Sequence, residues 1–379
     1  MLSSTIEKHI FHNNNLNSMS GRLIILTYDF APNNGGIARL CSEIRNQCIA
    51  TGTPYQVITA VDGPPMDNVV RLPGRRGLSE WRMLRYVRRH VKPDDVVLTG
   101  MFHPEGLLAR LGGCHRVYHL AHGAELLPGK SWFRHHVWEH YRRWLLAKAT
   151  RVIANSHYTA DLAKHCSPQA EVMALPLAVD TGRFRPTRPK HADGLLHLCS
   201  ISRLEKFKAH DFVIETIASL PAEYRSRIRL EIAGKGAYRP ELERLVEEHR
   251  LGDIVTFLGF VADDDLCDFY SRNDAFILCT REEPGNRNVE GFGLVFTEAQ
   301  ACGTPAIGTR AGGIPDAVSD GNGGWLIEQD NGSQLARLLM HMVDHPDEVA
   351  RQGLKARARV SEQCTWDKYF KALTGIVGI

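Results

Sequence analysis

The sequence predicts an α/β protein built from two doubly wound, Rossmann-like domains that face each other across a cleft. Short apolar runs alternate with amphipathic stretches along the chain, and this alternation is typical of parallel sheets covered by helices on both faces. The alternation breaks at residues 180–194, "DTGRFRPTRPKHADG", which hold two prolines and few apolar residues. With 379 residues, the chain is long enough for two hydrophobic cores.

Five strands are expected before this break and five after it. The first series is expected at residues 22–27, 55–61, 95–100, 116–122 and 151–156, and the second at 195–202, 227–234, 254–259, 274–279 and 304–309. Helical stretches such as "IARLCSEIRNQCIATG" and "RPELERLVEEHRLG" separate them, with a glycine near their ends. We therefore expect domains at 21–185 and 195–361. A polar tail at 1–20 precedes them, and a helix at about 362–379 is expected to pack back on the first domain.

Composition excludes several classes of protein. Hydrophobic residues make up 43% of the chain and charged residues 23%, as in ordinary globular proteins. No apolar run approaches the ~18 residues of a membrane helix, and the first residues lack the apolar core of a secretory signal. The nine cysteines form no CxxC pair, which favours reduced thiols and a cytoplasmic location. Net charge is only +3, so charged partners must be recognised by local clusters.

Glycines follow the first predicted strand, in "YDFAPNNGGIARL". Gly35 and Gly36 would precede a helix that starts near Ile37. Glycine allows a close approach of a ligand to the backbone, and a helix N-terminus offers unpaired N–H groups to an anion. The pattern predicts either a phosphate site or a simple turn that needs positive φ.

Two cations follow the first strand of the second series, in "SISRLEKFKAHD". Arg203 can bind phosphate oxygens with two parallel N–H groups, and Lys208 adds a point charge. They are compatible with a diphosphate site or with a solvated loop.

Two carboxylates bracket a glycine-rich turn in "EGFGLVFTEAQACGTPAIGTRAGGIPD". Glu290 precedes "GFG", and Glu298 should lie one to two turns into the following helix. Carboxylates accept paired hydrogen bonds from vicinal hydroxyls, so one could face a sugar ring and the other a ribose. Acids at a helix start are also favoured by the helix dipole alone.

These motifs together resemble glycosyltransferase family 4 (GT4), whose members are retaining enzymes with the GT-B fold. The resemblance extends over about residues 21–370 and includes "DFAPNNGGI", "HGAE", "EGFGLVFTEAQACGTPAI" and "GGIPDAV". Within the family, the sequence is similar to bacterial phosphatidylinositol mannoside mannosyltransferases. It departs from the family pattern at Ala209, where glycine is usual, and at Asp316, where glutamate is frequent.

The resemblance implies a role for each motif residue. Arg203 and Lys208 would grip the diphosphate, Glu290 would contact the donor sugar, and His122 would lie over the sugar near its 6-hydroxyl; these four are the expected catalytic residues. A lone histidine after a strand is more often structural. The expected nucleotide-sugar contacts begin with Gly35 and Gly36, where the Gly36 amide would touch the distal phosphate. The backbone around Phe260 and Val261 would meet the base, the backbone of Phe292, Gly293 and Leu294 would seat sugar and phosphate, and Glu298 would bind the ribose.

The function implied by the resemblance is transfer of a hexose, with mannose favoured, from a nucleotide diphosphate sugar to a hydroxyl. GDP-mannose is the favoured donor and UDP-sugars are the second choice. The acceptor would be a glycan or a lipid-linked molecule in cell-envelope, polysaccharide or lipopolysaccharide synthesis. Front-face attack is implied, with no enzymatic nucleophile. Two alternatives remain: another GT-B enzyme that uses a UDP-sugar, such as a glucose or GlcNAc transferase or an epimerase, and a non-catalytic nucleotide-sugar binder.

No cofactor is expected. Asp263 and Asp265 form a DxD pattern in "ADDDL", but this run precedes a helical pattern and is interpreted as an N-cap with first-turn acids. No cluster with metal-ligand spacing accompanies it, and the resembled fold neutralises its leaving group with Arg and Lys. Activity should therefore be independent of metal.

Two basic stretches indicate a partner. Residues 71–92 hold eight Lys or Arg and a single acid, Glu80, and residues 130–148 mix Trp and Tyr with Lys and Arg. Such stretches either lie on anionic membranes or form a solvated basic face. We expect peripheral association with the inner face of the plasma membrane and a lipid-linked acceptor. Nucleic acid is a poor alternative, because no recognised binding motif accompanies the charge.

Overall fold

The first sheet explains the apolar runs of the N-terminal half. The computed structural model describes residues 21–127, 137–283 and 288–379. Seven parallel strands lie in the order β3-β2-β1-β4-β5-β6-β7. Their bounds are β1 Leu23–Thr27, β2 Tyr55–Thr59, β3 Val69–Arg71, β4 Val96–Thr99, β5 Arg116–Ala121, β6 Arg151–Ala154 and β7 Val172–Ala174. β1 lies inside the sheet, between β2 and β4, and every residue of it is buried, as expected for a strand covered on both faces.

The second sheet has six parallel strands in the order β10-β9-β8-β11-β12-β13. Their bounds are β8 Leu196–Ile201, β9 Ile228–Ala233, β10 Val255–Gly259, β11 Ala275–Leu278, β12 Ala306–Thr309 and β13 Gly324–Ile327. In both sheets the order in which strands are added reverses beside the first strand, between β1 and β4 and between β8 and β11. Ligands of open α/β sheets bind at such switch points, beyond the carboxyl ends of the strands.

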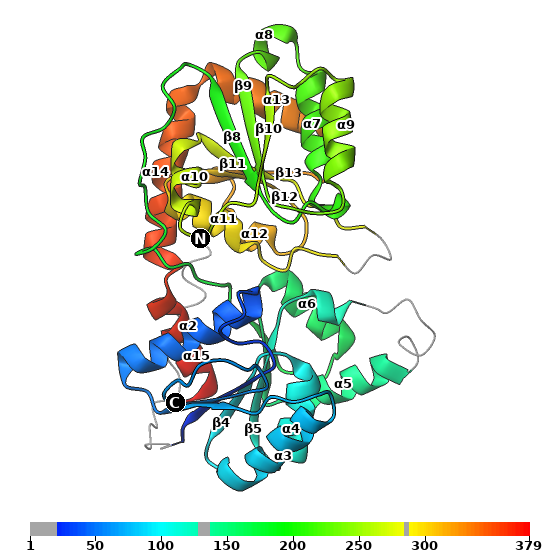
Figure 1. The fold of residues 1–379 in the computed structure, drawn as a ribbon, viewed down its shortest axis with the longest axis vertical. Coiled ribbons are helices and arrows are strands. Elements are labelled where there is room, and N and C mark those ends of the chain that lie inside the picture. The colour runs from blue at the N-terminus through cyan, green and yellow to red at the C-terminus, as the bar shows by residue number, and fades with distance from the viewer. Residues whose placement is uncertain (1–20, 128–136, 284–287) are drawn as a thin grey trace.

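Helices cover both faces of each sheet (Figure 1). In the first half they are α2 Gly36–Thr51, α3 Leu78–His90, α4 Leu107–Leu111, α5 Glu139–Ala147 and α6 His157–Cys166. In the second half they are α7 His210–Ser219, α8 Ala222–Arg225, α9 Arg239–Glu248, α10 Leu266–Arg272, α11 Leu294–Ala301, α12 Ile314–Ala317, α13 Gly332–Asp344 and α14 Pro346–Gln363. Short helical turns η1 Phe102–Gly106, η2 Ala124–Leu126 and η4 Lys206–Lys208 complete the loops.

The last helix, α15 (Trp366–Val377), lies against α2 of the first domain (Figure 1). The Arg116 guanidinium donates to the carbonyl oxygens of Val377 and Gly378, at 2.5 and 3.0 Å. The Val179 N–H, at the end of the first domain, donates to the Cys364 carbonyl at 2.9 Å. The chain thus crosses between the domains twice at neighbouring points, and these crossings leave the loops at the carboxyl ends of the two sheets facing each other.

All ten predicted strands are present, but three further strands were not predicted. β3, β7 and β13 are only three or four residues long, and each lies at the edge of its sheet. β3 and β7 have no fully buried residue. A short, half-exposed edge strand such as β3 or β7 needs no apolar run, so periodicity does not reveal it. β13 is mostly buried and was missed although it is apolar.

Candidate active site

Loops from both domains surround a cavity of about 500 Å³ between them. Four predicted catalytic residues, His122, Arg203, Lys208 and Glu290, line this cavity. Four predicted nucleotide-sugar contacts also line it: Gly36, Phe292, Gly293 and Leu294. The cavity therefore brings together motifs that lie up to 258 positions apart, from Gly36 to Leu294.

The glycine pair after β1 is not required by backbone conformation. Gly35 has φ −66°, and α2 begins at Gly36, which is not among the positive-φ residues. This rules out the interpretation as a positive-φ turn. A Cβ added at Gly36 would meet no atom within 4 Å, so the space in front of this helix N-terminus is open to the cavity. Because Gly36 has no side chain, an anion could approach the N–H groups at this helix N-terminus closely.

Lys208 and Glu290 form an ion pair inside the cavity. The Lys208 ammonium lies 2.6 Å from the Glu290 carboxylate, and the two side chains are only 11% and 18% exposed. The predictions assigned them separately, one to the diphosphate and one to the sugar. Their contact means that an anionic ligand must compete with Glu290 for the lysine.

Arg203 lines the same cavity but is largely solvent-exposed. Its side chain is 73% exposed and its guanidinium pairs with Glu205 at 2.6 Å. The contact of the Arg203 guanidinium with Glu205 is a surface ion pair, and such pairs contribute little in water. The Arg203 side chain can turn toward a diphosphate without loss of a buried contact.

The loop that carries Arg203 and Lys208 contains a non-glycine residue in a left-handed backbone conformation. Ala209, between η4 and α7, has φ 55° and ψ 35° and is fully buried. This left-handed conformation explains why glycine is usual at this position. The buried His210 ring lies 2.8 Å from the Ser202 hydroxyl, and burial lowers the pKa of this histidine to about 4. His210 therefore braces the loop as a neutral side chain.

His122 follows β5 and faces the cavity from the first domain. Its Nε2 lies 2.8 Å from the Gly100 carbonyl oxygen, so Nε2 carries the proton in this bond. Its backbone N–H donates to the Glu125 carboxylate at 2.6 Å. The first bond fixes the orientation of the ring and the second fixes the backbone of the turn.

Glu298 is the fifth residue of α11 and is 7% exposed. It accepts a hydrogen bond from the buried Tyr270 hydroxyl at 3.2 Å, and burial raises its pKa. The residues that line the cavity in the described part of the chain do not include Glu298, Gly35, Phe260 or Val261. Phe260 is 70% exposed, with the Lys235 ammonium 5.7 Å above its ring. Only part of the predicted nucleotide contact surface thus borders this cavity directly.

The interpretation of "ADDDL" as an N-cap is right in position, because Asp265 is the N-cap residue of α10, but the expected side-chain contact is missing. Asp265 directly precedes α10 but makes no side-chain capping bond. Asp263 instead pairs with Arg39 of α2 at 2.7 Å and with Arg183 at 3.6 Å, so it joins the two domains. Within residues 21–127, 137–283 and 288–379, no group of three or more His, Cys, Asp or Glu side chains is arranged to hold a metal ion.

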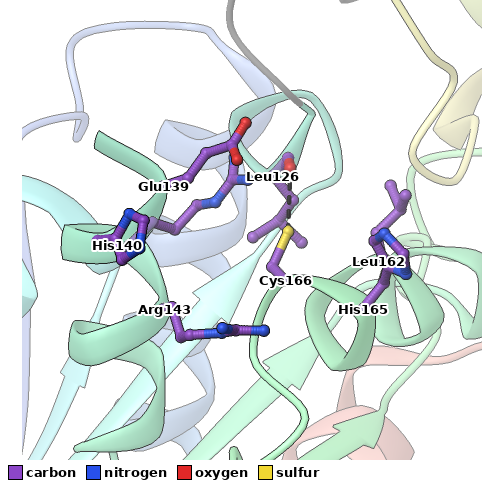
Figure 2. Close-up of a pocket in the computed structure, with 8 residues that line it drawn as sticks. Leu126, Glu139, His140, Arg143, Leu162, His165 and Cys166 are labelled. Atoms are coloured by element: carbon purple, nitrogen blue, oxygen red, sulfur yellow. Dashed lines mark hydrogen bonds between the residues drawn. The ribbon is translucent and has the colours of Figure 1, made fainter. Parts of the chain in front are cut away.

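A second cavity, of about 380 Å³, lies between α5 and α6 of the first domain (Figure 2). It is lined by Leu126, Glu139, His140, Arg142, Arg143, Leu162, His165 and Cys166. None of these is a predicted catalytic or nucleotide-sugar residue, but residues 139–143 belong to the second basic stretch. The buried Arg142 donates to the carbonyl oxygens of Glu125 and Leu127, at 3.4 and 3.2 Å. This side of the domain therefore supports the turn that follows His122.

Comparison with known proteins agrees with this geometry. Residues 34–183 match the family described as Glycosyltransferase Family 4, and residues 186–359 match Glycosyl transferases group 1. A GDP-mannose-dependent alpha-(1-6)-phosphatidylinositol monomannoside mannosyltransferase from Mycobacterium tuberculosis is 28% identical, over 91% of this chain and 95% of its own length. A GDP-mannose-dependent monoacylated alpha-(1-6)-phosphatidylinositol monomannoside mannosyltransferase from Corynebacterium glutamicum is 27% identical, over 95% of this chain and 98% of its own length.

Solved structures share the fold. HepE from Anabaena, in complex with UDP and glucose, superposes with a TM-score of 0.73 at 17% identity, over 94% of this chain and 99% of its own. Sucrose-phosphate synthase from Thermosynechococcus elongatus gives 0.74 at 21% identity, over 94% and 98%. The two family matches adjoin and together span nearly all of both domains, and the chain is therefore a GT-B glycosyltransferase of family 4.

Proposed function

We propose that this enzyme transfers mannose from GDP-mannose to a hydroxyl of a lipid-linked or glycan acceptor, with retention of configuration. The full-length similarity to GDP-mannose-dependent mannosyltransferases supports this donor. In this proposal the first domain, residues 21–185, binds the acceptor. The second domain, residues 195–361, binds the nucleotide sugar.

The convergence of Gly36, Lys208 and Glu290 on one cavity carries the proposal. The costly part of the reaction is the negative charge that builds on the departing diphosphate. Lys208 and Arg203, from the loop after β8, and the N-terminus of α2, from the first domain, would stabilise this charge. When the diphosphate takes Lys208, the Glu290 carboxylate is released and can accept hydrogen bonds from sugar hydroxyls.

The chemical step needs no protein nucleophile in this scheme. The acceptor oxygen bonds to the anomeric carbon on the face from which the diphosphate leaves. The acceptor proton passes to an oxygen of the departing phosphate. His122 would contact the sugar, and Glu298 would bind the ribose hydroxyls. Glu298 is not among the described residues that line the central cavity, so in this scheme it binds the nucleotide and takes no part in proton transfer.

A thermal-shift series with GDP, GDP-mannose, UDP and UDP-glucose tests the donor. A ligand at 100 times its dissociation constant should stabilise the protein by about 2.7 kcal/mol, so the guanosine ligands should raise the melting temperature most. A larger shift with the uridine ligands would transfer the proposal to a UDP-sugar. Stabilisation without transfer to any acceptor, phosphatidylinositol monomannoside included, would identify a non-catalytic binder.

Transfer activity is expected to survive EDTA. The diphosphate charge would be met by Lys208 and Arg203, while Asp263 is already paired with Arg39 and Arg183. Activity is measured after dialysis against EDTA, with a mock dialysis as control. A loss that manganese or magnesium restores would revive Asp263 and Asp265 as ligands.

Membrane docking through α3 is the proposed link to a lipid-linked acceptor. Trp81 is 54% exposed, and Arg85 lies over its ring at 5.3 Å. Arg82, Arg88 and Arg89 are exposed on the same helix.

The second basic stretch, 130–148, is described only from residue 137 onward. Across the described residues, no helix is both long and apolar enough to cross a bilayer. We propose peripheral attachment at the inner face of the plasma membrane.

The protein should cosediment with vesicles that contain an anionic lipid more than with neutral vesicles, and salt should reduce this binding. Each Lys or Arg near an anionic surface is worth roughly 1 kcal/mol. Replacing Arg82, Arg85, Arg88 and Arg89 with Ser should therefore weaken binding strongly. The control removes the same charge from the second domain, with Ser at Arg244, Arg337, Arg351 and Lys355. Equal effects of both sets, or no binding by the wild type at low salt, would exclude docking through α3.

A further inference from the structure

The loop that carries Glu290 is packed directly on the first domain. A Cβ added at Gly291 would lie 2.0 Å from the His122 carbonyl oxygen. A Cβ at Gly313 would lie 2.0 Å from the Gly291 carbonyl oxygen and 2.8 Å from the Ser156 hydroxyl oxygen. No side chain fits at either position, so backbone meets backbone across the cleft.

Two side chains in the first turn of α6 reach across beside this contact. The Tyr158 hydroxyl donates to the Glu282 carboxylate at 2.9 Å. The His157 backbone N–H and ring Nδ1 both contact the Asp316 carboxylate, at 2.8 and 2.5 Å. Figure 1 shows α6 facing the part of the second domain that holds α11 and α12.

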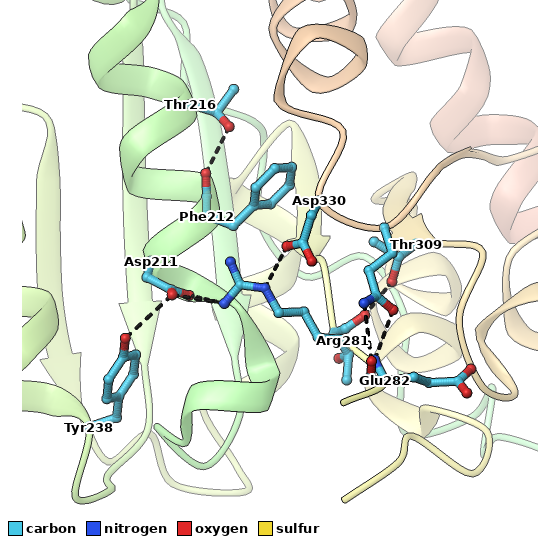
Figure 3. A network of polar contacts seen from close by, with 10 residues as sticks. Asp211, Phe212, Thr216, Tyr238, Arg281, Glu282, Thr309 and Asp330 are labelled. Carbon is cyan, nitrogen blue, oxygen red and sulfur yellow. Dashed lines mark hydrogen bonds and ion pairs between the residues drawn. The ribbon is translucent and has the colours of Figure 1, made fainter. Parts of the chain in front are cut away.

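Glu282 is anchored firmly within the second domain (Figure 3). The preceding Arg281 binds Asp211 through two contacts, at 2.9 and 2.8 Å, and Asp330 at 2.5 Å. The Glu282 N–H donates to the Gln329 side chain at 2.9 Å, and Gln329 donates back to the Glu282 carbonyl at 3.1 Å. Because both its N–H and its C=O are hydrogen-bonded to Gln329, the backbone of Glu282 is held in the second domain. The contact of its carboxylate with Tyr158 therefore fixes α6 relative to the second domain.

The same carboxylate also reaches the sugar-site loop. Its other oxygen accepts a hydrogen bond from the Gly312 N–H. The next residue, Gly313, donates from its N–H to the Glu290 carbonyl at 2.8 Å. Three hydrogen bonds and the Gly312–Gly313 peptide bond therefore link Tyr158 in the first domain to the backbone of Glu290 in the second.

We infer that Tyr158 and Glu282 are positioning residues, which hold the cleft closed and fix Glu290 at the donor sugar. Among the described residues that line the central cavity, neither appears, so they would act through the Gly312–Gly313 turn. This inference rests on the proposed role of Glu290 in sugar binding. Small errors in the position of a contacting group can reduce turnover up to a hundredfold, so the loss of one hydroxyl in this chain of contacts should be measurable.

The test is Tyr158→Phe, with Tyr224→Phe as the matched control. The Tyr224 hydroxyl donates to Asp344 at 3.0 Å, within the second domain and on its surface. Tyr158→Phe should lower kcat for transfer from GDP-mannose about tenfold and leave the Kd of GDP within twofold. It should also increase the radius of gyration of the ligand-free protein in small-angle X-ray scattering. Tyr224→Phe should change none of these quantities. In a Glu282→Ala background, Tyr158→Phe should have no further effect.

The scattering measurement needs neither donor nor acceptor. If another nucleotide sugar proves to be the donor, the proposed donor fails while the scattering result still decides whether the cleft opens. An unchanged radius of gyration in Tyr158→Phe overturns the inference. The inference is also overturned if Tyr158→Phe opens the cleft but leaves kcat normal with the donor that the enzyme uses. Tyr158 would then hold the domains together without positioning Glu290.

Discussion

Lys208→Ala is expected to lower turnover on the order of a hundredfold or more. The lysine side chain is 89% shielded from solvent and lies at the cavity where the diphosphate would bind. Removal of one preorganised charge stabiliser from a dry site typically costs about 3–4 kcal/mol in the transition state. The substitution also leaves the Glu290 carboxylate without its cation, which adds repulsion toward an incoming diphosphate. Initial rates with saturating donor measure the effect.

Lys206→Ala is the control, because Lys206 lies in the same short helix, carries the same charge and is exposed. It should retain near-normal turnover. Circular dichroism should show both variants folded. Arg203→Ala should resemble Lys208→Ala, since its exposed guanidinium can leave Glu205 for the diphosphate at little cost. Near-normal turnover in folded variants of both Arg203 and Lys208 would exclude the diphosphate assignment.

Sequence patterns predicted the two sheets because the central strands are buried on both faces and must be apolar. They failed at β3 and β7, which lie half-exposed at sheet edges. The same physics explains why many of the predicted site residues lie around one cavity. Loops after parallel strands meet at one edge of a sheet, so motifs found after β1, β5, β8 and β11 had to converge once two domains faced each other.

The side-chain contacts inside that site could not be predicted. Lys208 and Glu290 are 82 positions apart, and Tyr158 and Glu282 are 124 apart. Such pairs depend on how two domains approach each other, and no local pattern encodes this. Asp263 is another example: its place before a helix suggested capping, whereas its actual partner, Arg39, comes from the other domain.

Glu290→Ala and Glu298→Ala are expected to have opposite consequences. Glu290 restrains Lys208 in the ligand-free protein. Its removal frees a cation for the diphosphate, so free GDP should bind as tightly as before or several-fold more tightly. Sugar transfer should nevertheless fall on the order of a hundredfold, because the donor sugar loses the carboxylate that would orient it.

Glu298→Ala should instead weaken GDP binding by about tenfold or more, since one carboxylate can accept bonds from both ribose hydroxyls. Glu298→Gln separates this from a packing defect, because Gln nearly keeps the volume around the Tyr270 hydroxyl. Calorimetric titration with GDP, without any donor sugar, distinguishes the two sites directly. A binding loss in Glu290→Ala but not in Glu298→Ala would mean that the two roles are reversed. Tighter GDP binding in Glu290→Ala together with failed transfer would mean that the Lys208–Glu290 pair opens when the donor binds, and that Glu290 acts only after the diphosphate has displaced it.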